Sequence, residues 1–390
     1  MMWLVWRWAV VAVLASGLGA QTRFDAEAAA GRSVAGIFER ALEDRSLEGL
    51  DCQVRTQPAR LSFDLQIFTG YEFTLPLRQF EAGKQGLLLN VFRVTPNKPE
   101  GAPVWFVRRW PLPEFPEKSV QSRRTYLQLG GGFIVGPGEY QVDWLLLDGR
   151  DRVCRKSWKV KAKEARAKSL GIEEGLVDDD RRLMAWKGPG EQAGAEAKRA
   201  TIFLHAAPTF RRRVYTRLSF WDRRLLLTSL KNTVERGGFT AARVVVFDLE
   251  RRQVLFEAEE FGAEEYRRLG RVLGEVDLAT IDYGTLASGE TEWAFLEKMV
   301  GPERGRDTDA VVFITPAWRD GQRRQRLSEG FWEGGAPVFA VALAPAVRYT
   351  TGAVVDFARA LRGRVLNVYQ PMDLAAATER LRRELAGAAR

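Results

Sequence analysis

Histidine and cysteine are scarce in this sequence, which has one histidine and two cysteines among 390 residues. A protein zinc site usually takes three or four nitrogen or sulfur ligands, so these three residues do not predict one. The chain also lacks the G-x-S-x-G sequence that places a nucleophilic serine before a helix. The glycine-rich segment LGGGFIVGPG (129–138) is expected to lie between strands with no helix after it, which argues against a phosphate-binding loop. We therefore expect no cofactor, no resident metal and no catalytic residues.

Long hydrophobic runs are missing after the first 20 residues. Those residues carry Arg7 as a charged flank, an apolar stretch over 8–18 and small residues ending at Ala20. The apolar stretch is too short to cross a bilayer, and the pattern is that of a cleaved signal peptide. We expect a secreted or periplasmic protein with no integral membrane segment after cleavage. An uncleaved anchor is the alternative.

Positive charge exceeds negative charge, with 59 Lys and Arg against 50 Asp and Glu and a formal net charge of +9. Such an excess attracts anionic surfaces, acidic polymers or phosphate groups in a salt-dependent way. The alternative is a generally basic surface with no particular partner.

The two cysteines, Cys52 and Cys154, can form a disulfide in an exported protein. That disulfide closes a loop of roughly 100 residues and stabilises the folded chain by about 4–5 kcal/mol. Two unpaired thiols are the other interpretation.

The first half of the chain reads as a short helical segment (21–49) followed by a β-sandwich domain (50–162). Residues 61–68, LSFDLQIF, alternate apolar and polar side chains as a half-buried strand does. Further strands are expected at 87–94, 102–110, 139–148 and 153–160, with no helix of length between the later ones. Short connections favour antiparallel pairing. Residues 163–199 are rich in charge, glycine and alanine and are predicted to be a linker.

From residue 200 to 390, short apolar strands alternate with helical patterns. Ser219 and Asp222 form a capping sequence for a helix whose buried stripe is Leu226, Leu230 and Val234. The expected strands are Thr201–Leu204, Arg243–Asp248, Gln253–Glu257, Ala310–Thr315, Pro337–Leu343 and Val365–Tyr369, and the later helices are Ala263–Leu273, Thr291–Val300, Ala353–Leu361 and Asp373–Leu385. The tight connection DLERRQV predicts one antiparallel hairpin. The expected fold class is α/β, a doubly wound and mostly parallel sheet preceded by an all-β sandwich.

Two resemblances add to these patterns. The stretch GPGEYQVDWLLLDGRDRVCRKSWKV (136–160) resembles the closing hairpin of an immunoglobulin-like sandwich, with Cys154 on its last strand. The order of strands and helices over about 200–386 resembles the von Willebrand factor type A domain, and the whole arrangement is similar to bacterial secreted proteins related to that family. The family carries a metal-ion-dependent adhesion site at the carboxyl ends of the strands.

The residues at those family positions differ from the family's motif. The motif D-x-S-x-S falls on HAAPT, which puts His205 at the aspartate and Thr209 at the last hydroxyl position. Thr291 matches the family's threonine, and Pro316 stands where a second aspartate is expected. Mg²⁺ prefers carboxylate and hydroxyl oxygens. The resemblance therefore implies a degenerate site that has lost its metal, and metal-dependent adhesion through replacement ligands such as Asp282 or Asp320 stays open.

His205 has three interpretations. It is a buried imidazole that supports the strand end, or it lines a remnant binding pocket with Thr209 and Thr291, or it is the base of a hydrolase. The third needs a nucleophile and an orienting carboxylate beside it.

The segment FRRRVYTR (210–217) predicts an anion-binding rim made by Arg211, Arg212, Arg213 and Arg217. Arginine forks suit carboxylate and phosphate oxygens, and neighbouring aromatic rings can stack on a partner. Arg323, Arg324 and Arg326 beside Phe331 and Trp332 are expected at the same rim, and a solvated basic loop is the alternative. We predict an exported, non-enzymatic binding or scaffold protein. Its expected partner is a protein or an anionic cell-surface polymer, and nucleic acid is not expected. The oligomeric state is not predicted.

Overall fold

The structure is a computed structural model, in which the chain folds into two compact units. Unit 1 comprises residues 1–62 and 66–183, and unit 2 comprises residues 63–65 and 184–390. The described residues are 21–98, 101–163, 168–180, 185–188, 198–209, 217–276, 289–317, 327–345 and 351–387. The predicted signal peptide, residues 1–20, lies outside them.

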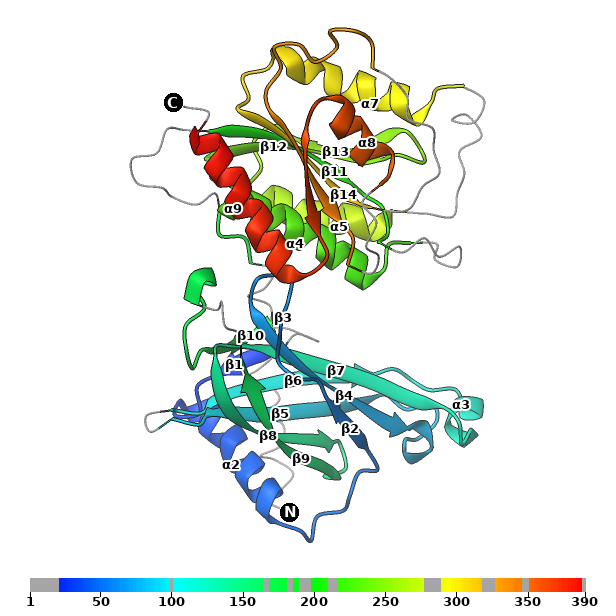
Figure 1. The fold of residues 1–390 in the computed structure, drawn as a ribbon. Helices are drawn as coiled ribbons and strands as arrows, with labels where there is room; N and C mark the ends of the chain where they lie inside the picture. Colours follow the sequence, from blue (N-terminus) through cyan, green and yellow to red (C-terminus); the bar gives the residue numbers. More distant parts are fainter. Residues whose placement is uncertain are drawn as a thin grey trace. The chain divides into compact units, whose positions relative to one another are not determined.

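Unit 1 contains two antiparallel sheets (Figure 1), of strand orders β1-β6-β5-β8-β9 and β10-β7-β4-β2, with β3 also paired to β4. The strands are β1 (Thr22–Phe24), β2 (Gln53–Thr56), β3 (Arg60–Leu61), β4 (Ile67–Pro76), β5 (Gly86–Pro96), β6 (Val104–Leu112), β7 (Tyr126–Val135), β8 (Gly138–Asp148), β9 (Val153–Ala162) and β10 (Val177–Asp179). The helical elements are α2 (Ala29–Glu43), η1 (Leu77–Gln79), α3 (Glu117–Gln121) and η2 (Lys168–Leu170). Strand β10 falls inside the segment that the sequence predicts to be a linker.

Aromatic side chains fill the space between these two sheets. The rings of Tyr71 and Phe92 lie 5.5 Å apart, and those of Phe73 and Trp144 lie 5.3 Å apart, each pair joining β4 to a strand of the other sheet. All four side chains are buried. On the opposite face of the first sheet, α2 packs its apolar stripe against residues of β5, β6 and β8. The helical segment predicted over 21–49 therefore contains a helix, α2, that packs on the sheet through its apolar side.

Two sequence expectations in unit 1 are wrong. Residues 61–68 are not a continuous strand, because a turn separates β3 from β4 and Leu65 takes a positive φ of 57°. Asp64 lies in this turn, within the tripeptide assigned to unit 2. Its carboxylate forms an ion pair with Arg224 at 2.9 Å. Gly130, Gly131 and Gly132 of the segment 129–138 do not lie between strands but within β7, where a Cβ on Gly132 would lie 2.2 Å from the Phe68 ring. Glycine is needed there because aromatic rings of β4 lie over it.

Unit 2 contains a six-stranded mixed sheet of order β13-β12-β11-β14-β15-β16. Neighbouring strands pair in parallel except for edge strand β13, which runs antiparallel to β12. The strands are β11 (Arg199–His205), β12 (Ala241–Asp248), β13 (Gln253–Ala258), β14 (Ala310–Pro316), β15 (Val338–Leu343) and β16 (Arg364–Val368). Every residue of β14 and β15 is buried, as expected for strands covered on both faces.

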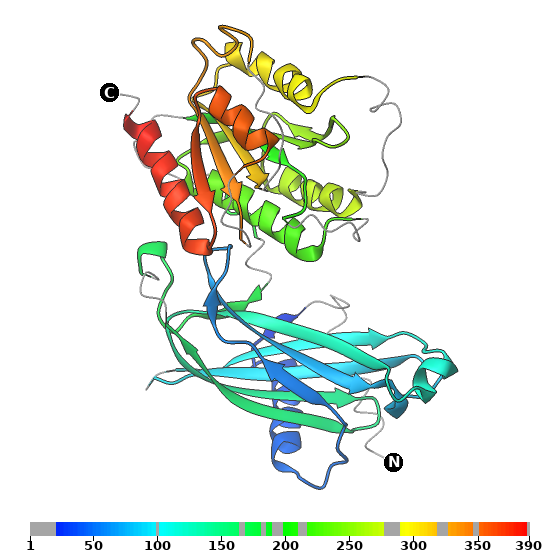
Figure 2. The same ribbon diagram turned by 45° about the vertical axis from the view of Figure 1, so that its right-hand side comes forward.

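Helices cover both faces of this sheet (Figures 1 and 2). Helices α4 (Phe220–Arg236), α5 (Ala263–Glu275) and α9 (Pro371–Gly387) contribute to the core on one face, and α7 (Glu292–Val300) and α8 (Ala353–Ala360) to the core on the other. A short helix, η4 (Gly301–Gly305), follows α7. Ser219 caps α4 through a capping box with Asp222, and Leu226, Leu230 and Val234 are fully buried.

The expected fold class is wrong for this chain. The sequence predicts a doubly wound, mostly parallel sheet behind an immunoglobulin-like sandwich, whereas the structure has two antiparallel sheets and one mixed sheet. The longest ladders belong to unit 1, where short connections leave no room for crossover helices and the strands therefore pair antiparallel. In unit 2 the tight connection 249–252 turns β13 back against β12 and makes that sheet mixed, which confirms the antiparallel hairpin predicted at DLERRQV.

Candidate functional site

His205 ends strand β11 and is 3% exposed. Its Nδ1 lies 3.0 Å from the Thr315 hydroxyl of neighbouring strand β14, and its ring stacks on Phe247 of β12 at 5.2 Å, with 9° between the planes. The imidazole therefore ties three adjacent strands together where they end. This arrangement agrees with the interpretation of His205 as a supporting residue of the sheet.

Thr209 follows β11 and is held by a carboxylate rather than by His205. Its backbone N–H and its hydroxyl both donate to Asp222 Oδ1, at 2.8 and 2.6 Å. The other oxygen, Oδ2, accepts from the Ser219 hydroxyl at 2.6 Å and from the Ser219 N–H at 3.3 Å. The Asp222 carboxylate thus fastens the chain after β11 to the first turn of α4, where a negative charge is favoured by the helix dipole.

Thr291 performs a local task at another helix. Its hydroxyl accepts a 3.1 Å hydrogen bond from Ala294 N and so caps α7. The hydrogen bonds described here thus join His205 to Thr315, Thr209 to Asp222 and Thr291 to its own helix, and they do not assemble the three residues into one pocket. The interpretation as a remnant pocket gains no support from these contacts.

Among the described residues, the side chains found here at the end of the sheet do not resemble a magnesium site. His205 and Pro316 stand at positions where the von Willebrand factor type A motif has carboxylates, and the Asp222 carboxylate already accepts four hydrogen bonds. Over the residues that the structure describes, no group of three or more His, Cys, Asp or Glu side chains is arranged to hold a metal. The possible replacement ligands Asp282 and Asp320 lie outside those residues.

Replacing Asp222 by alanine is expected to lower the free energy of unfolding of unit 2 by about 2 kcal/mol, because the carboxylate's hydrogen bonds to Ser219 and to Thr209 are lost together, although Ser219 Oγ can still accept from the backbone N–H of residue 222. Urea unfolding measures the effect. Glu264→Ala, which removes an exposed acid from the first turn of α5, is the control and is expected to change stability by less than about 0.5 kcal/mol. Equal effects of the two substitutions would contradict this role for Asp222.

The predicted arginine rim is described in part. Arg211, Arg212 and Arg213 lie outside the described residues, as do Arg323, Arg324 and Arg326, whereas Arg217 is exposed. Three and four residues further along, Phe220 and Trp221 are 59% and 70% exposed, and their rings meet edge to face at 5.5 Å. Large aromatic side chains this exposed are typical of interaction surfaces. We call Arg217, Phe220 and Trp221 the α4 entry surface.

Sequence reasoning missed Phe220, Trp221 and the tethering role of Asp222. A usable signal was present, since Asp222 lies four residues before Leu226, in line with the buried stripe of α4. The two aromatic residues fall off that stripe, which is the pattern of an exposed apolar pair. The partner of His205, Thr315, left no local signal because it comes from a strand 110 residues away.

Comparisons with known proteins do not assign this chain to a family. No protein-family model matches the sequence, and no curated protein matches it. Among solved structures, similarity is found to a putative ApaA protein from Bordetella pertussis, with 10% identity over 30% of this chain and 99% of that one, at a TM-score of 0.18. An alkylpurine DNA glycosylase AlkC from Pseudomonas fluorescens shows 11% identity over 40% of this chain and 44% of that one, at 0.20.

A glycosyl hydrolase family 2 member from Bacteroides cellulosilyticus shows 13% identity over 80% of this chain and 36% of that one, with a TM-score of 0.19. This chain therefore spans less than half the length of the glycosylase and about a third of the hydrolase. TM-scores this low support no conclusion about fold or activity. The resemblance to the von Willebrand factor type A family stays a prediction.

Proposed function

We propose that this protein is an exported, non-enzymatic binding or scaffold protein that recognises an anionic protein without a metal ion. The observation that carries the proposal is the α4 entry surface, an exposed Phe220–Trp221 pair beside exposed Arg217. Tryptophan and arginine are enriched among the residues that dominate protein interfaces. The net charge of +9 supports an anionic partner, because it steers such a partner toward the surface.

A fixed support favours binding at this surface. Thr209, Ser219 and Asp222 lock the first turn of α4 to the end of β11, so the aromatic pair stands on backbone that binding does not have to order. His205 adds rigidity to the same strand end through Thr315 and Phe247. In this proposal His205 and Thr209 act by supporting the surface rather than by touching the partner.

Export is part of the proposal. The disulfide between Cys52 and Cys154 is of a kind that persists in oxidising compartments, which supports a secreted or periplasmic location. Among the described residues, no helix has both the length and the apolar character needed to cross a bilayer.

The double variant Arg217→Glu with Trp221→Ala is expected to bind an acidic Glu–Tyr copolymer at least tenfold more weakly than the natural chain, a loss of about 1.4 kcal/mol or more. Binding is measured by biolayer interferometry at several salt concentrations, and chelator is expected to leave it unchanged. Arg304→Glu, the same charge change at an exposed residue of η4, is the control.

Equal binding by both variants would refute the proposed surface. Tighter binding to heparin than to the copolymer, with the same dependence on Arg217 and Trp221, would replace the protein partner by an anionic glycan. Loss of binding in chelator would favour the metal-dependent alternative.

A further inference from the structure

Unit 1 contains a cavity that none of the functions above uses. It has a volume of about 320 Å³, and its apolar part is formed by Phe80, Leu87, Leu112 and Phe115. The two phenylalanine rings lie 6.1 Å apart at a tilt of 41°. A cavity of this size and composition accommodates a small organic molecule.

The charged residues around the cavity carry one excess positive charge. Lys84, Arg150 and Arg152 are balanced by only two carboxylates, Glu81 and Asp148. Arg152 and Asp148 form a buried pair at 2.6 Å, with side chains 11% and 6% exposed, and therefore neutralise each other. Lys84 and Arg150 share the single carboxylate of Glu81. The pKa of Glu81 lies below its ordinary value because the Lys84 ammonium donates a hydrogen bond to it.

The walls of the cavity are fixed by interactions of the protein itself. Arg152 Nη2 donates to the Gln79 carbonyl at 2.9 Å, which ties the turn between β8 and β9 to the chain before Phe80. Gly83 N donates to the Phe115 carbonyl at 3.0 Å and ties Phe115 to the chain between Glu81 and Lys84. The cavity is thus formed before any ligand enters, which lowers the entropic cost of binding.

We propose that this cavity binds a small monocarboxylate with an aromatic or branched apolar body. The apolar body packs against the Phe80 and Phe115 rings, and the carboxylate lies at the mouth beside Arg150 and Lys84, where it supplies the second negative charge that these two cations lack. Arginine suits a carboxylate because its planar fork donates two parallel hydrogen bonds. A cationic ligand is disfavoured by the excess positive charge.

Calorimetric titration of the full chain with phenylacetate tests the proposal. We expect one-to-one binding with a Kd of about 1 mM or tighter, and at least tenfold weaker binding of the neutral phenylacetamide. Gly149 lines the cavity, and a Cβ there meets no atom within 4 Å. Gly149→Phe is therefore expected to fill the space and abolish binding. Gly49→Phe, also in unit 1 and also open at Cβ, lies outside the lining and is expected to bind as the natural chain does.

The charge part of the proposal has its own variants. Lys84→Gln with Arg150→Gln is expected to weaken phenylacetate binding at least tenfold. Lys161→Gln is the control, because Lys161 is also exposed and also paired, with Glu139 at 3.0 Å, but does not line the cavity. It is expected to leave phenylacetate binding unchanged. Circular dichroism confirms that each variant is folded. No binding by the natural chain at 10 mM phenylacetate, equal affinity for the amide, or binding that survives Gly149→Phe would overturn the proposal.

Discussion

Replacing both cysteines by serine is expected to lower the free energy of unfolding of unit 1 by about 4–5 kcal/mol, the largest single effect we expect in this chain. The disulfide joins Cys52 to Cys154 across a sequence separation of 102 residues. Without it, the unfolded chain gains the conformational freedom of that whole loop. A loss of this size is a large fraction of the stability of a domain of ordinary size.

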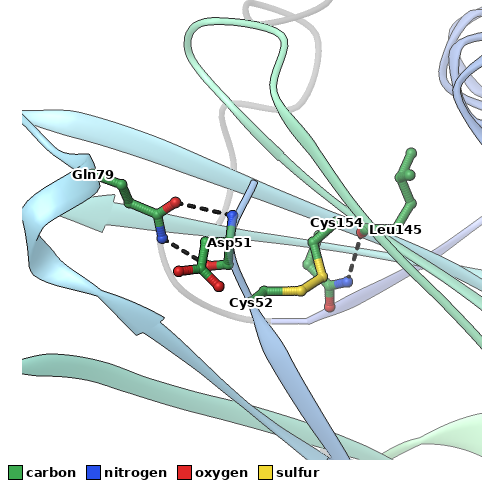
Figure 3. The surroundings of a disulfide bond; sticks show 6 residues. Asp51, Cys52, Gln79, Leu145 and Cys154 are labelled. Atoms are coloured by element: carbon green, nitrogen blue, oxygen red, sulfur yellow. Dashed lines mark hydrogen bonds between the residues drawn. A yellow bond between two sulfur atoms is a disulfide. The ribbon is translucent and has the colours of Figure 1, made fainter. Parts of the chain in front are cut away.

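Hydrogen bonds near the disulfide do not substitute for its stabilising effect. Gln79 exchanges two hydrogen bonds with the backbone of Asp51, at 3.0 and 2.8 Å (Figure 3), and Leu50 N donates to the Val153 carbonyl. These bonds position the chain in the folded state but vanish on unfolding, whereas the covalent link restricts the unfolded state as well. The substitution should therefore destabilise the protein even though the folded contacts around residue 52 remain.

Hydrogen exchange read by mass spectrometry, together with urea unfolding, measures this loss. Amides of unit 1 should lose protection in the double serine variant, while those of unit 2 keep theirs. Dithiothreitol provides the matched control, since it should destabilise the natural chain by the same amount and leave the variant unaffected. Equal stability of the oxidised natural chain and the variant would contradict the prediction.

The sequence predicted the helices and strands of unit 2 better than their assembly. Helix α4 was identifiable because Ser219 and Asp222 make a local cap and because Leu226 repeats with Leu230 at helical spacing. These signals act over a few residues. The short connection DLERRQV also predicted the antiparallel pairing of β13 with β12. The order of the strands in each sheet depends on contacts between distant segments, which periodicity does not encode, and the fold class assigned to the whole chain was wrong.

The alternating pattern of 61–68 illustrates the same limit. Period-2 alternation indicated a strand, but the segment turns at Leu65, and Asp64 pairs with Arg224, which lies 160 residues further along the chain. Conversely, β7 was missed because its three consecutive glycines indicate a loop by composition alone. Gly131 and Gly132 pack closely against the rings of Tyr71 and Phe68, and Gly130 against the Tyr71 backbone, and these contacts are visible only once β4 is placed beside β7.

The sequence predicted where His205 lies in the fold and did not predict what it contacts. His205 does end a strand at the carboxyl edge of the sheet, but its partners Thr315 and Phe247 come from other strands. The pattern over 219–236 was interpreted through its capping residues and its buried stripe, and the exposure of Phe220 and Trp221 was therefore not predicted. A single sequence therefore does not predict contacts with residues far along the chain, and it does not predict which apolar side chains stay exposed.

A buried carboxylate in unit 2 carries the second large effect. Glu303 of η4 is 1% exposed and accepts hydrogen bonds from the Thr201 hydroxyl at 2.7 Å and from Arg243 Nη1 at 2.8 Å. Arg306 Nε lies 3.3 Å away. Through these contacts Glu303 joins the start of β11, strand β12 and η4. Removing one partner of a buried ionic network leaves the others desolvated and uncompensated.

Glu303→Ala is therefore expected to cost about 3–5 kcal/mol in the free energy of unfolding of unit 2. Glu303→Gln keeps the size and one acceptor oxygen, so we expect a smaller loss of about 1–3 kcal/mol. Urea unfolding at low and high salt measures both. The loss at Glu303 should persist in 1 M salt, because buried pairs are screened little.

Glu259 supplies an unusually close control for this prediction. It contacts the same two arginines, Arg243 at 2.9 Å and Arg306 at 2.7 Å, but its side chain is 59% exposed. Glu259→Ala removes the same charge from the same partners and is expected to cost less than about 1 kcal/mol, a cost that salt should abolish. Because charge and partners are shared, any difference between the two variants comes from burial and from Thr201. Equal losses would mean that burial does not set the strength of this network.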